Sequence, residues 1–363
     1  MSNVIHVSFP TREERRADAL GTLIRDFAIS RRLDTDVFWL KENGELLNIL
    51  ECTGAQVAPA ILGVHEATYS ALPERLAFFP QYYRFLVSLA LDLEDLGLSA
   101  GPTGNVAQRM CDWVVDQGLA EGETSDIQRL EAQRLLSRRN CQARLDTAAV
   151  QARLRQFISA PQRFALPNKK AAYELTHIVF YLTEYGRIAP DFDAALQESL
   201  ENVGVWAFLD GNADLLAEVC IAMRYAGYNP YDTWESWIAQ RMKSVTLTRA
   251  PAVPAGDAYH SVFMGAWLSA LRGGDGLAAL DVQPGEGAPV LMMPKPDHSA
   301  LREMSRHLYG MPDRSSDWAR MRGVLDDRLS DQARGQLASA LETGDAFERF
   351  FEGFARASRV VQA

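Results

Sequence analysis

The chain has 363 residues, 47% of them hydrophobic and 23% charged, which is enough apolar material for a sizeable core. Its formal net charge of -10 argues against nucleic acid or an anionic membrane surface as the main partner, because binding phosphate requires clustered Lys and Arg. No apolar run reaches the roughly 18 residues that a membrane span requires, and no secretory signal precedes the first helical pattern. The four cysteines are widely spaced without a Cys-x-x-Cys pair, so we expect reduced thiols and a cytoplasmic location.

Helical periodicity dominates the chain from Thr11 onward. Thr11 and Glu14 form a capping box ahead of the first apolar stripe, and residues 1–10 are expected to form a tail. Gly and Pro separate the periodic segments, and alternating runs of Val, Ile and Thr are nearly absent, so we predict an all-α protein. Further helices are predicted at about residues 34–51, 61–71, 81–96, 103–119, 125–139, 146–159, 168–186, 191–209, 212–227, 231–244, 257–272, 297–308, 315–328, 331–342 and 345–359.

Two segments interrupt this pattern. Residues 246–256 contain two prolines and are predicted to form a loop, and residues 273–295 form a longer loop rich in Gly and Pro. The phrase APVLMMPKP, which begins in the second loop, is either a short strand or an ordered binding loop. The last predicted helix carries a stripe of phenylalanines that is typical of core or subunit packing. The stripe consists of Phe347, Phe350, Phe351 and Phe354.

The stretch AAYELTHIVFYLTEYG, residues 171–186, shows two stripes when it is placed on a helix. One stripe is apolar, and the other carries Glu174, His177, Tyr181 and Glu184 at spacings of three and four. Each member of the second stripe can donate or accept a proton. A surface helix would carry Lys, Arg and Gln there, so the composition favours a polar face that is turned toward an interior cavity.

A weak repeat relates this stretch to two later helices. The phrases THIVFYLTEYG, AEVCIAMRYAG and YHSVFMGAWLS align so that His177, Glu218 and His260 share one position. Each pair of copies is separated by one further helix that is richer in charge. A period near 40 residues with two helices is typical of stacked α-hairpins, which form either an open α-solenoid or a closed (α/α) toroid. An ionisable residue at the shared position favours the toroid, with inner helices around a central funnel.

We therefore predict a single large domain of paired antiparallel helices. Residues 11–160 form its N-terminal helical region, residues 161–275 its helical-hairpin core with the candidate site, and residues 276–363 a loop and helices that cover the core.

One phrase within the core suggests a relationship to other proteins. Tyr-Glu-Leu-Thr-His at residues 173–177, followed later by Tyr259 and His260, resembles helices of an uncharacterised bacterial all-α family over residues 165–275. This resemblance implies no activity. In architecture alone, the pattern is similar to the wider class of (α/α) toroids, which includes terpenoid cyclases, six-hairpin glycosidases and lanthionine cyclases. The chain lacks the Asp-rich motif and the Cys-His zinc set of those enzymes, so their chemistry is not implied.

The polar residues of the core permit three interpretations. The first is acid–base catalysis by His177, His260, Glu174 and Glu218 in an aromatic funnel. The second is a mononuclear Fe, Mn or Zn site held by two histidines and one carboxylate, namely His177, His260 and one of Glu174, Asp214 or Glu218. The third is a buried structural network in which the histidines bond to Glu218 or Asp214. Candidate ligand-binding residues are Tyr173, Tyr181, Asp214, Tyr225 and Trp267.

Two functions of different classes follow from these interpretations. The first is a cytoplasmic enzyme that acts on a small organic molecule in the funnel, by acid–base or metal-assisted chemistry, and that can be a homo-oligomer. The second is a non-catalytic helical-repeat protein that binds a protein partner through an aromatic cluster. That cluster comprises Trp206, Tyr231, Trp234 and Trp237. His65, outside the core, is expected at the surface, and Cys220, within the core, is expected in the interior.

Overall fold

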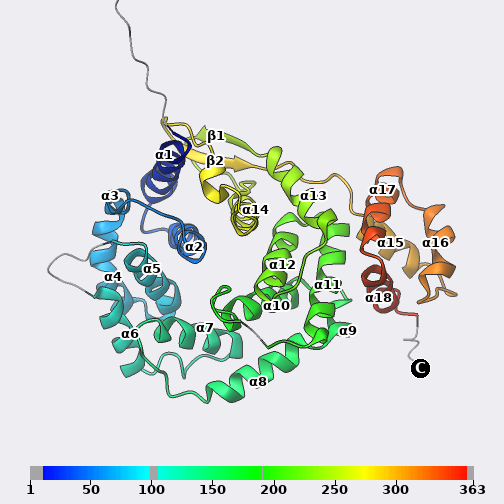
Figure 1. The fold of residues 1–363 in the computed structure, drawn as a ribbon, viewed down its shortest axis with the longest axis horizontal. Coiled ribbons are helices and arrows are strands. Elements are labelled where there is room, and N and C mark those ends of the chain that lie inside the picture. Colours follow the sequence, from blue (N-terminus) through cyan, green and yellow to red (C-terminus); the bar gives the residue numbers. More distant parts are fainter. Residues whose placement is uncertain (1–10, 99–104, 190, 358–363) are drawn as a thin grey trace, which may run out of the picture.

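The computed structural model describes residues 11–98, 105–189 and 191–357. These residues are mostly helical, which confirms the predicted class. Figure 1 shows helices in an inner and an outer layer, which alternate along the chain as it curves around the centre of the molecule. The predicted tail at residues 1–10 lies outside the described residues, as does the start of the helix that was predicted at 103–119.

The inner layer surrounds the functional region. Its helices are α2 (Val37–Cys52), α5 (Tyr83–Asp95), α7 (Asp126–Ser137), α10 (Lys169–Leu182), α12 (Ala213–Tyr225) and α14 (Tyr259–Leu271). The outer layer consists of α1 (Arg12–Arg25), α3 (Pro59–Leu62), α4 (Glu66–Phe78), α6 (Val106–Asp116), α8 (Thr147–Ile158), α9 (Pro161–Phe164), α11 (Ala194–Leu209) and α13 (Asp232–Lys243). Short π- or 3₁₀-helical turns lie at Asp26–Ser30, Gly63–His65, Pro80–Tyr82, Gly276–Ala279 and Leu341–Thr343.

Local sequence signals explain where several helices begin. The capping box at Thr11 is present, because the Thr11 side chain accepts from the Glu14 amide at 3.2 Å and the Glu14 carboxylate accepts from the Thr11 amide at 2.6 Å. Asn168 caps α10, and Asn212 caps α12 as predicted. These caps fix the first residues of the two helices that carry much of the candidate site.

Close packing joins neighbouring helices of the outer layer. In the α11–α13 contact, a Cβ added at Gly204 would lie 2.3 Å from Cη2 of Trp234, so only glycine permits this approach. Trp234 is fully buried and Trp206 is 1% exposed. The aromatic cluster that was expected to offer a partner-binding surface is therefore largely part of the core, because these indoles fill the space between helices.

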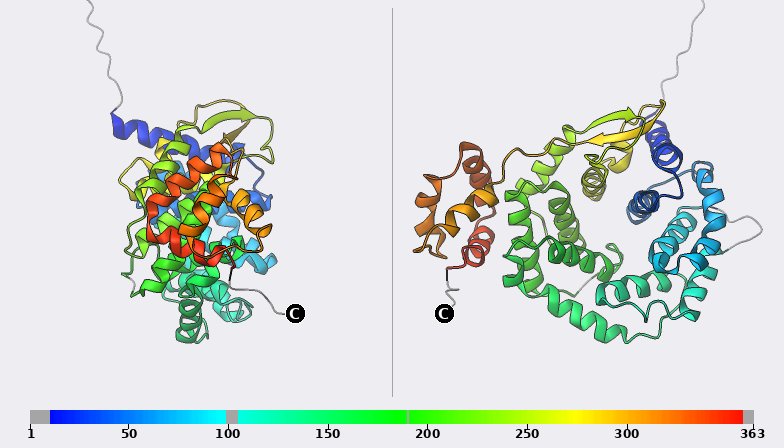
Figure 2. Two further views of the ribbon diagram at one scale, coloured as in Figure 1. Left: turned by 90° about the vertical axis from the view of Figure 1, so that its right-hand side faces the viewer. Right: turned by 180° about the vertical axis from the view of Figure 1, so that it is seen from behind.

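The C-terminal helices lie on the outer side of the helical layers, next to α11 (Figure 2). They are α15 (Ala300–Tyr309), α16 (Trp318–Asp326), α17 (Asp331–Ala340) and α18 (Asp345–Phe354). The phenylalanine stripe of α18 is buried, and Trp318 packs edge-on against Phe347 and Phe351 with ring centroids 4.9 and 5.0 Å apart. The prediction of core packing for this stripe is therefore confirmed.

A small two-stranded antiparallel sheet corrects the loop prediction for residues 246–256. Strand β1 (Thr246–Ala250) pairs antiparallel with β2 (Ala288–Met292), with Thr246 opposite Met292. The second strand falls in the phrase for which a strand and a loop were both open. The strand that pairs with β1 lies about forty residues away in the sequence. Each strand is too short for its alternation of apolar and polar residues to predict a sheet.

Two helix boundaries also differ from the prediction. Helix α4 continues through Pro73, because Tyr69, Leu72 and Leu76 still bury an apolar face on either side of it. Helix α10 ends at Leu182, whereas the prediction extended it to residue 186. Glu184 and Tyr185 adopt left-handed backbone conformations, with φ of 48° and 54°. Glu184 therefore leaves the polar stripe on which the sequence had placed it.

Among the described residues, no helix combines the length and the apolar character needed to cross a membrane.

Candidate functional site

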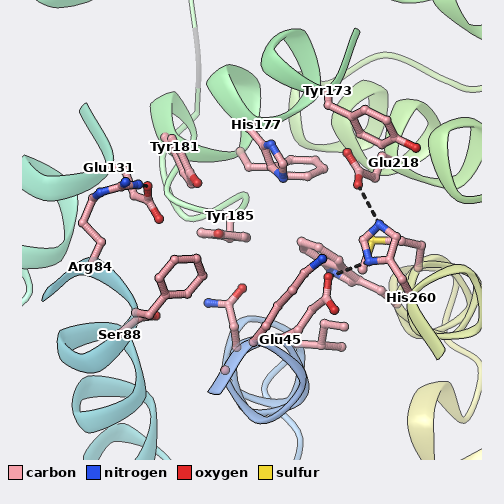
Figure 3. A pocket seen from close by; sticks show the side chains of 18 of the residues that line it. Glu45, Arg84, Ser88, Glu131, Tyr173, His177, Tyr181, Tyr185, Glu218 and His260 are labelled. Atoms are coloured by element: carbon pink, nitrogen blue, oxygen red, sulfur yellow. Dashed lines mark hydrogen bonds and ion pairs between the residues drawn. The ribbon is translucent and has the colours of Figure 1, made fainter. Parts of the chain in front are cut away.

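All helices of the inner layer contribute to one central cavity of about 580 Å³ (Figure 3). Each inner helix buries an apolar face against the outer layer and turns polar and aromatic residues toward the centre. In α10, for example, Leu175, Ile178 and Val179 are buried, whereas His177 and Tyr181 line the cavity. Of the predicted polar stripe, His177 and Tyr181 thus face the interior cavity, whereas Glu174 and Glu184 do not.

His260, in the first turn of α14, is bound between carboxylates from two other helices. Its Nδ1 lies 2.6 Å from Oε1 of Glu45, and its Nε2 lies 3.5 Å from Oε1 of Glu218 and 3.8 Å from Oδ2 of Asp214. Burial by itself would lower the pKa of His260, but hydrogen bonds and attraction to Glu218 and Glu45 outweigh it and raise the pKa to about 10. His260 is therefore an imidazolium at neutral pH.

The carboxylates around His260 have further partners. The Glu218 side chain is 1% exposed, and its Oε2 accepts a hydrogen bond from Oγ1 of Thr176 at 2.6 Å. Oδ2 of Asp214 accepts from the hydroxyl of Tyr173 at 2.6 Å. This arrangement matches the structural-network interpretation as far as His260 is concerned, and it holds the carboxylates in fixed positions on the cavity wall.

His177 is in a different situation. Its ring stacks on Tyr181 at a centroid distance of 6.0 Å and contacts Phe180 edge-on at 5.8 Å. Within the described parts of the chain, no hydrogen bond or ion pair to its ring nitrogens is found, and Figure 3 shows the imidazole directed into the cavity. His177 therefore lies outside the network of His260 and is open to a ligand.

Two arginines occupy the side of the cavity formed by α5 and α7. Arg84 donates to Oε1 of Glu123 at 2.9 Å and also pairs with Glu131 (Figure 3). The side chain of Arg134 is 2% exposed, and its Nε lies 3.0 Å from Oε2 of Glu184. The cavity thus has a side rich in carboxylates and a side that carries guanidinium groups.

An aromatic cluster links these two sides. Tyr185 stacks on Trp267 with centroids 5.8 Å apart, and the guanidinium carbon of Arg134 lies 4.4 Å from the Tyr185 ring. The indole of Trp267 donates to the hydroxyl of Tyr225 at 2.9 Å. Burial raises the pKa of Tyr185 and Tyr225 above the ordinary tyrosine value, so both hydroxyls stay protonated.

Most residues that the sequence singled out line this cavity. They are Tyr173, His177, Tyr181, Asp214, Glu218, His260 and Trp267. Two do not: Glu174 forms an ion pair with Lys170 at 3.1 Å, one turn away on the same helix, and Tyr225 lies behind Trp267. Their roles were predicted from the residue types on each helix. Residue types alone do not show which side chains point into the cavity.

The residues that would form a metal site fail to assemble. Across the described ranges, no group of three or more His, Cys, Asp or Glu side chains has a geometry that could hold a metal ion. Both ring nitrogens of His260 face carboxylates, and an imidazolium has no lone pair to offer a metal. The predicted set of His177, His260 and Glu218 is therefore not arranged as metal ligands.

Sequence reasoning did not identify several lining residues, namely Glu45, Arg84, Glu131, Arg134 and Tyr185. A signal was present, since α2, α5 and α7 begin at about the same spacing as the later inner helices. Extending the predicted repeat toward the N-terminus would have marked these three helices as candidates. They share no histidine or short phrase with the later helices, so the signal there was weak.

Comparison with known proteins identifies the family. A family model described as "Domain of unknown function (DUF6902)" matches residues 1–357, so the chain belongs to this family. No curated protein and no solved structure matches the chain.

Proposed function

We propose that this member of the DUF6902 family is an enzyme that binds a small organic molecule in the central cavity and transfers a proton to or from it. The observation that supports this most is the contrast between its two histidines. His177 presents an unengaged imidazole to the cavity, whereas His260 is held as a cation between Glu45 and Glu218.

The two histidines would have different roles. A neutral imidazole without a protein partner can accept a proton from a ligand, so His177 is the candidate base. His260 stays protonated at neutral pH and cannot accept a second proton, so it would orient Glu45 and Glu218. In acid–base sites, two groups of the same type typically have different surroundings, so that one stays protonated and the other accepts a proton.

The cavity and its surroundings agree with a small ligand. A volume of about 580 Å³ falls within the range of about 300–1,000 Å³ that small-molecule sites occupy. We further propose that the hairpins form an (α/α) toroid, since the inner helices recur at about 45 residues and all reach this cavity. The four cysteines are unpaired, which supports a cytoplasmic location.

Replacement of His177 by Asn tests the proposal. The purified protein is incubated with a defined mixture of small metabolites, and consumption and product formation are followed by mass spectrometry. We expect the wild type to convert at least one compound and His177→Asn to lower its kcat by about 10²- to 10⁴-fold, because a proton acceptor is lost. Thermal stability should change little, since the described residues provide the imidazole with no hydrogen bond to lose.

His307→Asn is the matched control, because His307 lies in α15 and does not line the cavity. It should convert the same compound at the wild-type rate. Equal rates for wild type and His177→Asn would refute the role of His177 as a base.

A second candidate function rests on a different surface. Phe78, Phe79 and Tyr82, at the end of α4 and just before α5, are 76%, 43% and 37% exposed. Such neighbouring exposed aromatics favour binding of a protein partner. This surface, and not the Trp206 and Trp234 cluster, would serve the non-catalytic alternative.

A further inference from the structure

We propose that the ligand of the cavity is a dipolar organic molecule with a cationic nitrogen and a carboxylate at opposite ends. The nitrogen would be bound by Glu45, Asp214 and Glu218, and the carboxylate by Arg134. This inference rests on the proposed function and specifies the substrate class of the same site.

The side of the cavity near His260 has an excess of negative charge. Three carboxylates surround one imidazolium, with Nε2 of His260 within 3.8 Å of both Asp214 and Glu218. Lys41, one turn before Glu45 on α2, also lines the cavity, and the carboxylates still outnumber the cations. Oε2 of Glu45 is buried and has no described partner in hydrogen-bond geometry, although the Glu45 carboxylate lies close to the Tyr259 hydroxyl. An ammonium group with its three donors would supply both the missing charge and the missing hydrogen bond.

At Arg134, hydrogen-bond donors lack acceptors, whereas the charge of the guanidinium is already balanced by Glu184. The Arg134 side chain is 2% exposed and lines the cavity, and it has an ion-pair contact with Glu184 through Nε. Neither Nε nor Nη2 has an acceptor in hydrogen-bond geometry among the described residues. Buried guanidinium groups normally have their donors satisfied, and a carboxylate is the acceptor that fits their fork-like geometry. Arg84 differs, since Glu123 and Glu131 already engage it.

The backbone beside Arg134 supports a binding role. Glu184 and Tyr185 both have left-handed conformations, which place the Glu184 carboxylate on Arg134 and the Tyr185 ring against its guanidinium. Left-handed conformations are costly for residues other than glycine and are concentrated at functional sites. Here they fix Arg134 at the cavity wall.

Aromatic side chains occupy the space between the two charged sides. Figure 3 shows His177, Tyr181 and Tyr185 between the Arg84–Glu131 pair and His260. A short apolar segment between the ligand's charged ends would lie along these rings. The same segment would come next to His177, the candidate base.

Titration calorimetry with three matched series of compounds tests the proposal on the wild-type protein. The series are ω-amino carboxylic acids, alkylamines and alkyl carboxylates, each with about three to eight carbons, which a cavity of this size admits. At the best chain length, we expect the amino acid to bind at least about tenfold more tightly than the amine or the carboxylate, because only it satisfies both sides. Equal binding of a singly charged compound, or no binding in any series, would overturn the proposal.

Two variants test which residue binds each charged end of the ligand. Arg134→Gln should remove the advantage of the amino acid over the amine, and Glu45→Gln should remove its advantage over the carboxylate. Unchanged selectivity in both variants would also overturn the proposal. If Arg134→Gln does not fold, Glu45→Gln and the wild-type series still decide.

The measurement is independent of turnover, so the two proposals can fail separately. Conversion of a singly charged substrate, with no preference for amino acids, would refute the dipolar ligand and keep the enzyme. Selective binding of amino acids, with no compound converted, would support the dipolar ligand and refute the enzyme.

Discussion

Arg31→Met should lower the free energy of unfolding by about 3–5 kcal/mol, because it leaves the buried Asp257 without a cation and leaves Glu42 with Arg32 as its remaining cation. The Arg31 side chain is fully buried, and its partners Glu42 and Asp257 are 1% and 4% exposed. Nε of Arg31 lies 2.7 Å from Oε2 of Glu42, and Nη2 lies 2.5 Å from Oδ1 of Asp257. Nη1 donates to the carbonyl of Pro289 in β2 at 2.5 Å. One guanidinium therefore links the N-terminal helices to strand β2 and to the segment before α14.

The matched control is Arg153→Met. Arg153 also pairs with a carboxylate, Asp126, at 2.6 Å, but its side chain is 52% exposed. Exposed pairs contribute less than about 1 kcal/mol, so this variant should be close to wild type. Urea unfolding followed by circular dichroism measures both variants. An equal decrease in the free energy of unfolding for the two variants would contradict the larger effect expected for the buried Arg31.

His65 should make the protein lose stability as the pH falls below neutrality. The side chain is fully buried against Trp39, and neither ring nitrogen has a hydrogen-bond partner within the described residues. Burial lowers the pKa of His65 from 6.5 to about 4. The unfolded chain therefore binds a proton from pH 6.5 downward, whereas the folded chain stays neutral until about pH 4. The stability is complete above pH 6.5, and about 3 kcal/mol of it is lost by pH 4.

Replacing His65 with Leu should remove this loss. The variant should be at least as stable as wild type at pH 7, because it buries no unsatisfied nitrogen. Its advantage should then grow as the pH is lowered from 6.5 to 4, as measured by urea unfolding at several pH values. His307→Leu, in α15, is the control. A difference in unfolding free energy between wild type and His65→Leu that stays constant with pH would contradict a lowered pKa of His65 in the folded protein.

His65 also shows where local reading of the sequence failed. The dipeptide His65-Glu66 was expected at the surface of one helix, and the surface prediction for His65 is wrong. In the structure, a 3₁₀ turn ends at His65 and α4 begins at Glu66, so the two side chains have different surroundings. A change of helix type within one turn has no signature in hydrophobic periodicity.

Local periodicity was sufficient for much of the fold and for part of the site. The three ionisable residues that the predicted repeat aligned, His177, Glu218 and His260, all line the central cavity. Caps such as Asn212 were recognisable because capping is a contact within four residues. Cys220 is fully buried, as expected for a small apolar residue.

Contacts between distant segments could not be predicted from the sequence. Glu45 and His260 are 215 residues apart, and nothing in either helix marks the other as a partner. The same holds for the pairing of β1 with β2 and for the contact of Arg134 with Glu184. The ionisation of His260 and the charged sides of the cavity depend on these contacts, so they emerged only from the three-dimensional structure.

The most direct test of the site is the titration of His260 in the absence of ligand. Two-dimensional ¹H–¹⁵N spectra of the histidine rings, assigned with a His260→Asn variant, report the protonation of each nitrogen against pH. We expect both nitrogens of His260 to carry protons at pH 8 and the ring to titrate at about pH 10, with a lower value in Glu45→Gln. Titration of His260 at or below pH 6.5 would contradict a cation held among carboxylates, and the proposed ligand and chemistry would lose their basis.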